Sequence, residues 1–257
     1  MEIALLIPAF NEELGISRTA LVAREALDSG LVQRAVVLDG GSADDTAVIA
    51  EKFGVEVLDI PSTMPELGDV LGKGDSLYRG TRTIGADWFI FLDADLGNVC
   101  LDHITAFTEH IGTTPASFLK GGFVRIDENG IPRDIPAGRV TELVGRPLLR
   151  RVDNFLASFS QPLSGQVAIS RDLAMSIDFV TGYGIEVAMM IDVFRRVGRD
   201  GILEVDMGVI NNRWKPDDAL SDVSEQVLAG ASLRAVTMSE YGIVTHPLVQ
   251  NRDKQIP

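Results

Sequence analysis

Short runs of apolar residues alternate along the chain with longer segments in which apolar residues recur every three or four positions. The short runs are typical of strands buried on both faces, and the longer segments are typical of amphipathic helices. The apolar runs predict strands at residues 3–7, 35–38, 55–58, 89–92, 117–126, 167–170 and 202–209. The helical periodicity predicts helices at residues 16–29, 46–53, 75–84, 98–111, 138–151, 182–194 and 219–236. Because strands and helices alternate at this spacing, we expect an α/β fold: a Rossmann-like, mainly parallel central sheet flanked by helices.

The size and composition are those of a soluble globular protein. The chain has 257 residues, of which 46% are hydrophobic and 23% are charged, so it can bury a large core. Its apolar runs are shorter than the ~20 residues of a membrane span, and the first run lacks the basic flank of a signal peptide. The single Cys100 fits a reducing compartment. We therefore expect a cytoplasmic protein with no membrane span.

The charge pattern limits the classes of molecule that the protein can bind. A net charge of −14 argues against nucleic acid and anionic membranes, because both need a basic face. Between Lys120 and Arg151, however, seven basic residues stand against four acidic ones. Arginine forks suit carboxylate and phosphate groups, so this excess indicates a pocket for a small anion; a solvated basic surface is the alternative interpretation.

Two carboxylates end the apolar run at residues 89–92. Asp93 and Asp95 are two positions apart, so in an extended chain they share a face at the carboxyl end of the strand, where open α/β sheets bind ligands. Their repulsion calls for compensation, and a divalent cation carrying a nucleotide diphosphate would supply it, since Mg²⁺ and Mn²⁺ take oxygen ligands. The alternative is an ordinary pair of loop and helix-capping residues.

Three glycine-containing segments add candidate chemistry. Lys73 lies between two glycines at a helix start, where backbone and side chain can touch phosphate, although the spacing is not that of a Walker loop. Two glycines before Ser42 permit a tight turn, and Ser42 can cap the following helix. Glu186 follows a Gly-Tyr-Gly segment. Each has a plain alternative: a solvated lysine, a capping serine, and an acid favoured by the helix dipole.

The order of these motifs resembles that of a GT-A glycosyltransferase of the family 2-like superfamily, and in particular the retaining glucosyl-3-phosphoglycerate synthases. The matching segments run over nearly the whole chain: residues 6–13, 38–46, 72–74, 93–95, 138–143, 162–165 and 182–186. The resemblance implies a GT-A fold with a smaller acceptor-binding part. It further implies transfer of glucose from UDP-glucose to 3-phosphoglycerate with retention, a divalent metal (Mg²⁺ or Mn²⁺) and a homodimer.

The resemblance also assigns residues to roles. It implies that the nucleotide sugar is bound by Pro8, Ala9, Phe10, Glu12, Ser42, Lys73, Asp93, Leu163, Ser164 and Gly165. It implies that the acceptor is bound by Gly138, Arg139, Thr141 and Arg213. Lys73, Asp95 and Glu186 would be the catalytic residues. Residues 1–98 would then form the nucleotide-sugar-binding half, and residues 99–257 the acceptor-binding half with the C-terminal helix, within one GT-A domain.

The expected metal site departs from the family pattern. Asp93, Asp95 and Asn212 are the predicted metal ligands, with Asn212 where the family has a histidine. Amide oxygen is a poorer ligand than imidazole for a borderline metal, and His246 could substitute. Trp214 also replaces a polar acceptor contact. These departures keep two alternatives open: a transferase with another acceptor (glycerate, a lipid phosphate or another small alcohol), and a non-catalytic sugar-nucleotide binder. A nucleotidyltransferase with a similar sheet is a further alternative, but it would need a glycine-rich signature after the first strand, and this sequence lacks one.

Overall fold

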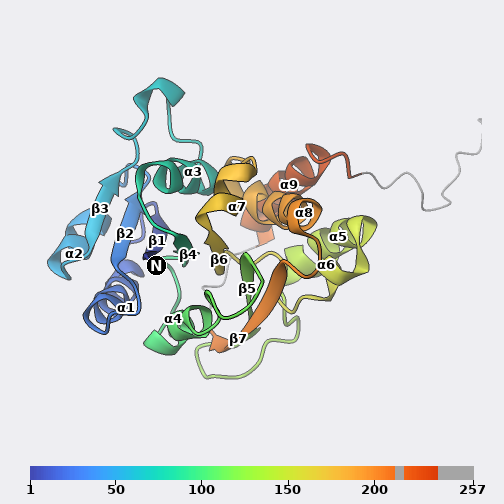
Figure 1. The fold of residues 1–257 in the computed structure, drawn as a ribbon, viewed down its shortest axis with the longest axis horizontal. Helices are drawn as coiled ribbons and strands as arrows, with labels where there is room; N and C mark the ends of the chain where they lie inside the picture. Colours follow the sequence, from blue (N-terminus) through green and yellow to red (C-terminus); the bar gives the residue numbers. More distant parts are fainter. Residues whose placement is uncertain (212–216, 237–257) are drawn as a thin grey trace, which may run out of the picture.

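The structure is a computed structural model that describes residues 1–211 and 217–236. Its centre is one seven-stranded sheet with the strand order β3-β2-β1-β4-β6-β5-β7 (Figure 1). The strands are β1 (Ile3–Ala9), β2 (Arg34–Asp39), β3 (Glu56–Asp59), β4 (Trp88–Phe91), β5 (Phe118–Arg125), β6 (Val167–Ser170) and β7 (Ile202–Ile210). β6 runs antiparallel to β4 and β5, and the other pairings are parallel. The predicted α/β class and mainly parallel sheet are thus confirmed.

The predicted helices also form, some of them shorter than the pattern indicated. They are α1 (Ile16–Asp28), α2 (Thr46–Lys52), α3 (Lys73–Thr83), α4 (Leu101–Thr108), α5 (Arg146–Val152), α8 (Ile185–Val197) and α9 (Asp217–Ser232). Two short helices, α6 (Asn154–Ser158) and α7 (Arg171–Ser176), were not predicted. The described residues also contain two short 3₁₀ helices, η1 (Pro65–Leu67) and η3 (Gly182–Gly184), and one short π-helix, η2 (Thr141–Gly145). Among the described residues, none of the helices has both the length and the apolar character needed to cross a membrane.

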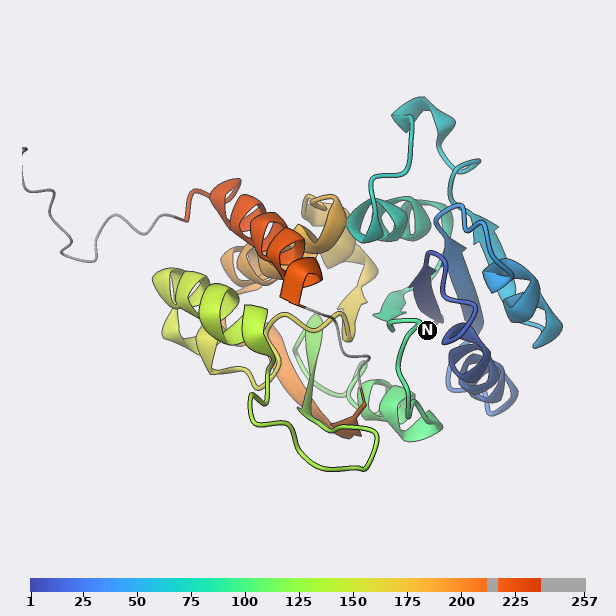
Figure 2. The ribbon, with the colours of Figure 1, turned by 180° about the vertical axis from the view of Figure 1, so that it is seen from behind.

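Both faces of the sheet are covered, because successive strand residues point to opposite sides. Leu6 and Phe89 belong to a core cluster shared with α3 and α5 to α9, whereas Leu5 and Ile90 belong to a second cluster shared with α1, α2 and α4. Figures 1 and 2 show these two helical layers on either side of the sheet. The inner strands β1 and β4 are apolar because neither face meets water, whereas the edge strands β3 and β7 carry exposed charged residues such as Glu56 and Asp206.

The sheet topology gathers several loops at one edge. The strand order reverses between the neighbouring strands β1 and β4. The chain continues from β1 to β2 toward one edge of the sheet and from β4 to β5 toward the other edge. Ligands bind at such a switch point. β6 is antiparallel, so its first residues lie at the edge where β1, β4 and β5 end. The segment before β6 therefore faces the loops that follow the parallel strands.

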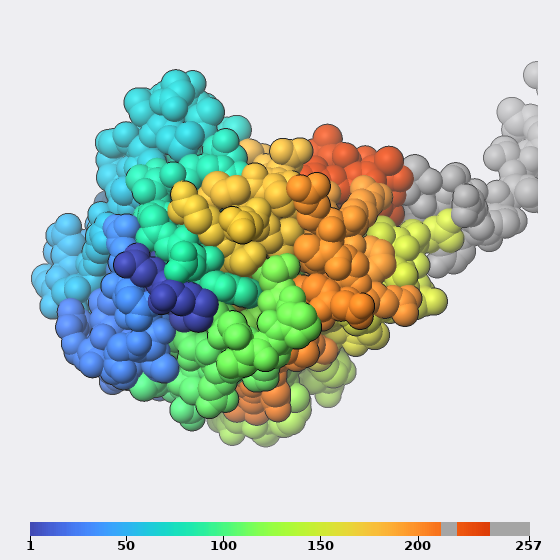
Figure 3. Space-filling model, in the orientation of Figure 1, coloured from blue at the N-terminus to red at the C-terminus, as the bar shows by residue number. Residues whose placement is uncertain are grey.

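The segment between β3 and α3 projects from the body of the molecule (Figures 1 and 3). Arg79 of α3 secures it: the fully buried guanidinium donates to the carbonyls of Thr63 (3.0 Å) and Gly68 (2.8 Å) and pairs with Asp75. A buried arginine is stable only when its donors are paired in this way. The anchor holds the chain immediately before α3, where Lys73 begins the helix.

Candidate active site

A pocket of about 1020 Å³ opens at this edge of the sheet. Most of the residues predicted from the sequence line it: Pro8, Ala9, Phe10, Glu12, Lys73, Asp93, Asp95, Gly138, Arg139, Thr141, Leu163, Ser164, Gly165 and Glu186. They come from the ends of β1 and β4, from the start of α3, from the segment before β6 and from the loops beside η2 and α8. Residues from both predicted halves of the chain therefore share one cavity.

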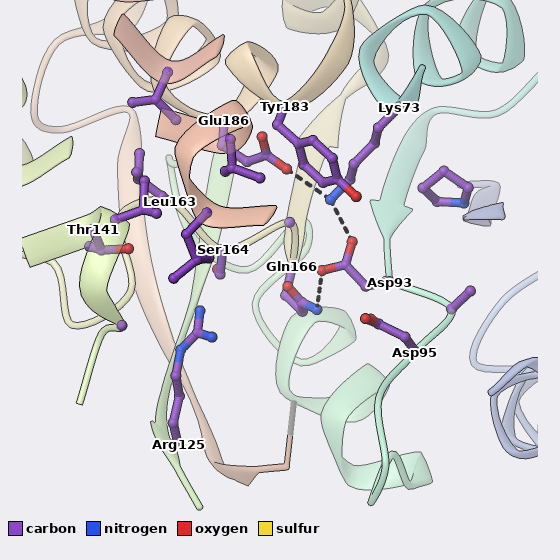
Figure 4. A pocket seen from close by; sticks show the side chains of 18 of the residues that line it. Lys73, Asp93, Asp95, Arg125, Thr141, Leu163, Ser164, Gln166, Tyr183 and Glu186 are labelled. Atoms are coloured by element: carbon purple, nitrogen blue, oxygen red, sulfur yellow. Dashed lines mark hydrogen bonds and ion pairs between the residues drawn. The ribbon is translucent and has the colours of Figure 1, made fainter. Parts of the chain in front are cut away.

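An ion cluster forms the floor of the pocket (Figure 4). The ammonium of Lys73 donates to Oδ1 of Asp93 at 2.5 Å and to Oε1 of Glu186 at 2.8 Å. The amide of Gln166 donates to the other Asp93 oxygen at 3.0 Å. Burial disfavours the ammonium, but the charges of Asp93 and Glu186 outweigh this effect and raise the pKa of Lys73 above its ordinary value. Lys73 is therefore a fixed positive charge at neutral pH.

Gly165 lies at the floor with the ion pair packed directly against its backbone. A Cβ atom at this position would lie 2.2 Å from Nζ of Lys73 and 2.5 Å from Oδ1 of Asp93, well inside contact distance. A side chain at position 165 would therefore displace the ends of Lys73 and Asp93 from their present places. The sequence motif alone does not reveal this close approach of the Gly165 backbone to Lys73 and Asp93.

The aspartate pair lies in the loop after β4, since β4 ends at Phe91. The strand thus stops before both carboxylates, and the alternation of faces within a strand does not apply to them. Both nevertheless point into the pocket from the same wall (Figure 4). The two oxygens of Asp93 accept hydrogen bonds from Lys73 and Gln166, so this carboxylate is held in place by the protein itself.

The described residues fit a divalent metal that is bound jointly with a diphosphate. Among residues 1–211 and 217–236, no cluster of three or more His, Cys, Asp and Glu side chains forms a metal site on its own. Mg²⁺ and related hard cations are commonly held by one or two carboxylates together with substrate phosphates and water. Asp95 beside Asp93 offers that donor set. The third predicted ligand, Asn212, lies outside the described residues, as do Arg213, Trp214 and His246.

Among the predicted site residues that the structure describes, Ser42 is the one that does not line the pocket. Its hydroxyl donates to Asp39 at 2.5 Å and accepts from the backbone N–H of Asn11 at 2.9 Å. Asn11 has φ of 54°, a left-handed conformation that asparagine tolerates better than most residues. Ser42 thus ties the loop after β2 to the loop after β1, and it acts on the pocket through the position of Phe10.

Lys120 of β5 lies beneath the segment 163–165. The side chain is 1% exposed, and its ammonium donates to the carbonyl of Ser164 at 2.5 Å. Burial lowers the pKa of Lys120 to about 7, partly opposed by Glu186 and Asp93 and reinforced by Lys73. The peptide that forms the pocket wall is therefore held from below by a lysine that gives up its proton near neutrality.

The other end of the pocket is basic. Gly138, with φ of 89°, directly precedes a helical segment that includes η2 and continues into α5, as the sequence predicted for residues 138–151. The first N–H groups of a helix lack intrahelical partners and suit a bound phosphate. A π-helical turn such as η2 often marks a functional site. Thr141 and Arg139 line the pocket here.

Arg125, Gln166 and Tyr183 are among the pocket residues that were not assigned from the sequence. Arg125 belongs to the basic excess noted between Lys120 and Arg151, so composition pointed to it without giving its place. Tyr183 lies within the Gly-Tyr-Gly segment that was singled out for Glu186. Gln166 had no signal in the sequence, because its role depends on the antiparallel direction of β6.

An open α/β sheet with an Asp-x-Asp loop beside a lysine at its carboxyl edge is the architecture of a nucleotide-sugar transferase of the GT-A type. Residues 4–161 match the model of glycosyl transferase family 2. The chain belongs to this family and is a glycosyltransferase with the GT-A fold.

Among curated proteins, the chain is 37% identical over 232 residues to glucosyl-3-phosphoglycerate synthase of Mycobacterium tuberculosis, covering 88% of this chain and 71% of that protein. A solved structure of the M. tuberculosis enzyme with Mn²⁺, UDP and glucosyl-3-phosphoglycerate superposes with a TM-score of 0.81 at 36% identity. That match covers 91% of this chain and 79% of the other. A second structure, with Mg²⁺ and UDP, gives 0.80 at 35% identity with the same coverage. The sequence-based resemblance is thus confirmed.

Proposed function

We propose that this chain transfers glucose from UDP-glucose to 3-phosphoglycerate, with retention of the anomeric configuration. The observation that carries the proposal is one cavity joining the Lys73–Asp93–Glu186 floor to the Gly138–Thr141 loop. The floor suits a nucleotide diphosphate sugar, and the loop suits a small phosphorylated acceptor. Support comes from the similarity over most of the chain to enzymes named for this reaction.

The donor would lie along the first half of the chain. Phe10 is 61% exposed at the pocket wall, so its ring is open to a ligand in the pocket. Phe10, with Pro8, Ala9 and Glu12, would hold the uracil and ribose. The backbone at residues 163–165 would line the glucose. In this arrangement the diphosphate reaches the start of α3, where Lys73 and the helix N-terminus favour negative charge.

The reaction would break the bond between the anomeric carbon and the β-phosphate oxygen and form a bond from the same carbon to the acceptor hydroxyl oxygen. Lys73 would stabilise the charge that develops on the departing diphosphate. A divalent metal held by Asp95, with Asp93 and Asn212 beside it, would supply further Lewis-acid stabilisation of that charge. The hydroxyl proton would pass to the departing phosphate oxygen, so that atoms and charges balance.

Retention requires either a covalent intermediate or attack from the side on which the diphosphate leaves. Glu186 is the carboxylate beside the expected sugar position, but its Oε1 accepts a hydrogen bond from Lys73 at 2.8 Å. A carboxylate neutralised by an ammonium is a weak nucleophile. We therefore favour same-face attack, with Glu186 stabilising the positive charge of an oxocarbenium-like sugar.

The acceptor phosphate would bind at Gly138, Arg139 and Thr141, and Arg213 would contact the same molecule. Glycerate is the second candidate acceptor, favoured by the replacement of a polar contact in the family by Trp214. We further propose that the protein acts in the cytoplasm, where nucleotide sugars are made, and that it works as a homodimer. Light scattering at several protein concentrations tests the dimer; a mass of 27.8 kDa throughout would refute it.

A UDP-release screen tests the function. Several nucleotide sugars are combined with 3-phosphoglycerate, glycerate or no acceptor, in the presence of Mg²⁺, Mn²⁺ or a chelator. We expect release only with UDP-glucose, metal and an acceptor together, fast with 3-phosphoglycerate and much slower with glycerate, and an α-linked product by NMR. Equal release with glycerate would mean that glycerate can replace 3-phosphoglycerate as the acceptor. A β-linked product would refute retention. Binding of UDP-glucose without turnover under any condition would refute the transferase activity of this chain.

A further inference from the structure

We propose that Arg125 is an acceptor-binding residue, held in a fixed orientation by Gln161, whose terminal guanidinium nitrogens receive the phosphate of the acceptor beside Gly138. This inference rests on the proposed function and extends it to a residue that neither the motifs nor the family resemblance assigns. It concerns a site group that would contact the substrate directly, at the end of the pocket opposite Lys73.

The orientation of Arg125 is set by a buried amide. Nε of Arg125 donates to Oε1 of Gln161 at 3.1 Å. The amide nitrogen of Gln161 donates to the carbonyls of Phe123 (3.0 Å) and Pro136 (2.8 Å), and the side chain is 1% exposed. Both amide hydrogens are thus used, so the oxygen must face Arg125. A glutamine that cannot flip leaves the guanidinium with one direction in which to present its remaining donors.

Those remaining donors face the cavity. Figure 4 shows Arg125 extending from the end of β5 with its guanidinium directed toward Ser164 and the middle of the pocket. Within the part of the chain that the structure describes, Nη1 and Nη2 of Arg125 have no hydrogen bond or ion pair. The buried Arg79, by contrast, uses Nε and both terminal nitrogens in hydrogen bonds. A guanidinium with two unused donor groups in a pocket is suited to bidentate capture of an oxyanion.

The electrostatic surroundings favour the same ligand. Burial lowers the pKa of Arg125, an effect opposed by Asp93 and Asp95 and reinforced by Arg133. The group remains a cation at neutral pH because arginine titrates far above it. A largely buried cation costs free energy until an anion joins it. A phosphate ester would supply that anion.

The position beside Gly138 identifies which acceptor group is bound. A Cβ atom at Gly138 would lie 3.7 Å from Cζ and 3.8 Å from Nη1 of Arg125, so the guanidinium adjoins the loop that precedes η2. An oxyanion received by the N–H groups at the start of that helix would also meet Arg125. Since this loop is the proposed phosphate site, we assign the phosphate, and not the carboxylate, to Arg125.

The test compares acceptors that lack one anionic group. Wild type, Arg125→Ala and Arg125→Lys are assayed with 3-phosphoglycerate, with glycerate (no phosphate) and with glycerol 3-phosphate (no carboxylate). For Arg125→Ala we expect KM for both phosphorylated acceptors to rise about 10- to 100-fold, the effect of losing hydrogen bonds to a charged group. We expect turnover of glycerate and KM for UDP-glucose to change less than twofold. Arg125→Lys should recover only part of the loss, because an ammonium cannot bind bidentately.

Arg150→Ala is the matched control, because Arg150 is an exposed arginine on α5 outside the pocket. Unchanged KM for 3-phosphoglycerate in Arg125→Ala overturns the inference. A loss that persists with glycerate and disappears with glycerol 3-phosphate also overturns it, because Arg125 then binds the carboxylate. If wild type shows no acceptor-dependent UDP release, the proposed function fails. Calorimetry with glycerol 3-phosphate then decides the role of Arg125: weaker binding by Arg125→Ala than by wild type supports it, and equal affinities refute it.

Discussion

The two ends of the pocket treat charge differently. At the donor end, the ammonium of Lys73 lies between Asp93 and Glu186, and Gln166 occupies the remaining Asp93 oxygen. At the acceptor end, Arg125 is oriented by one hydrogen bond, and its terminal nitrogens have no partner among the described residues. At the first end the cation is already paired with carboxylates of the protein. The second is left for a substrate to neutralise.

This difference indicates what each end contributes. A charge cluster that is paired before substrate arrives is rigid, so it can stabilise developing charge without reorganising. A guanidinium fixed in direction but lacking an anion gains most of its stabilisation on binding, which makes it a determinant of acceptor affinity. Substitutions at the donor end should therefore lower kcat, and those at the acceptor end should raise KM for the acceptor.

Lys73→Met should have the largest effect, because it breaks the paired end. We expect kcat to fall about 10²- to 10³-fold through loss of a charge-stabilising donor. The free energy of unfolding should fall by about 3 kcal/mol, since Asp93 and Glu186 would be left without their shared cation. Steady-state kinetics and urea unfolding measure the two effects. Lys52→Met, at an exposed lysine, is the control; a kcat of Lys73→Met within threefold of wild type would contradict the role of Lys73.

Gly165→Ala tests whether the close approach to the ion pair matters. The added methyl group would displace Lys73 or Asp93, and a shift of about 1 Å near reacting groups can cost on the order of 10²-fold in rate. We expect a loss in kcat of that size while KM for 3-phosphoglycerate stays within threefold of wild type. Gly85→Ala is a suitable control, because a Cβ atom there meets nothing within 4 Å. Equal activity of the two variants would show that the floor tolerates the methyl group.

Lys120→Met tests how the buried lysine beneath the pocket wall makes the free energy of unfolding depend on pH. In the unfolded chain Lys120 keeps its proton up to its ordinary pKa of 10.5, whereas in the folded chain it releases it at about 7. Between these values the unfolded state binds more protons, so through this group the folded state gains stability as pH rises. From pH 7 to pH 9 the gain is about 2 to 3 kcal/mol. The destabilisation caused by burying this lysine is therefore full below pH 7 and disappears above pH 10.5.

The measurement is the free energy of unfolding of wild type and Lys120→Met from pH 6.5 to 9. Wild type should gain about 2 to 3 kcal/mol relative to the variant over that range. The charged groups that act on Lys120 are Glu186, Asp93, Lys73 and Glu204, and all are present in both proteins. Parallel pH profiles for the two proteins would mean that Lys120 does not titrate in this range.

Ser42→Ala should have the smallest effect, because Ser42 acts on the donor end only through the loop after β1. Loss of its hydrogen bonds to Asp39 and Asn11 should lower the free energy of unfolding by about 1 kcal/mol. We expect a two- to fivefold rise in KM for UDP-glucose and no change in kcat. Ser17→Ala, at an exposed serine on α1, is the comparison. A large fall in kcat for Ser42→Ala would place Ser42 nearer the reaction than its position outside the pocket indicates.

By itself the sequence determined the elements and much of the site. Apolar runs mark the strands because both faces of the sheet are buried, and the motifs follow those strands because loops at one edge of a parallel sheet meet. Most of the residues assigned from these motifs do line one pocket. Such features depend on local spacing, which a single sequence displays.

Only the tertiary structure decided which charges meet. Lys73 lies 20 residues from Asp93 and 113 residues from Glu186, so their pairing depends on how α3, β4 and α8 pack. Tertiary packing also decided the place of Gln166, which follows from the antiparallel direction of β6. It likewise decided that Ser42 lies outside the pocket and that Gln161 orients Arg125. Electrostatic and hydrogen-bond partners are chosen by distance in space, and spacing along the chain does not contain that information.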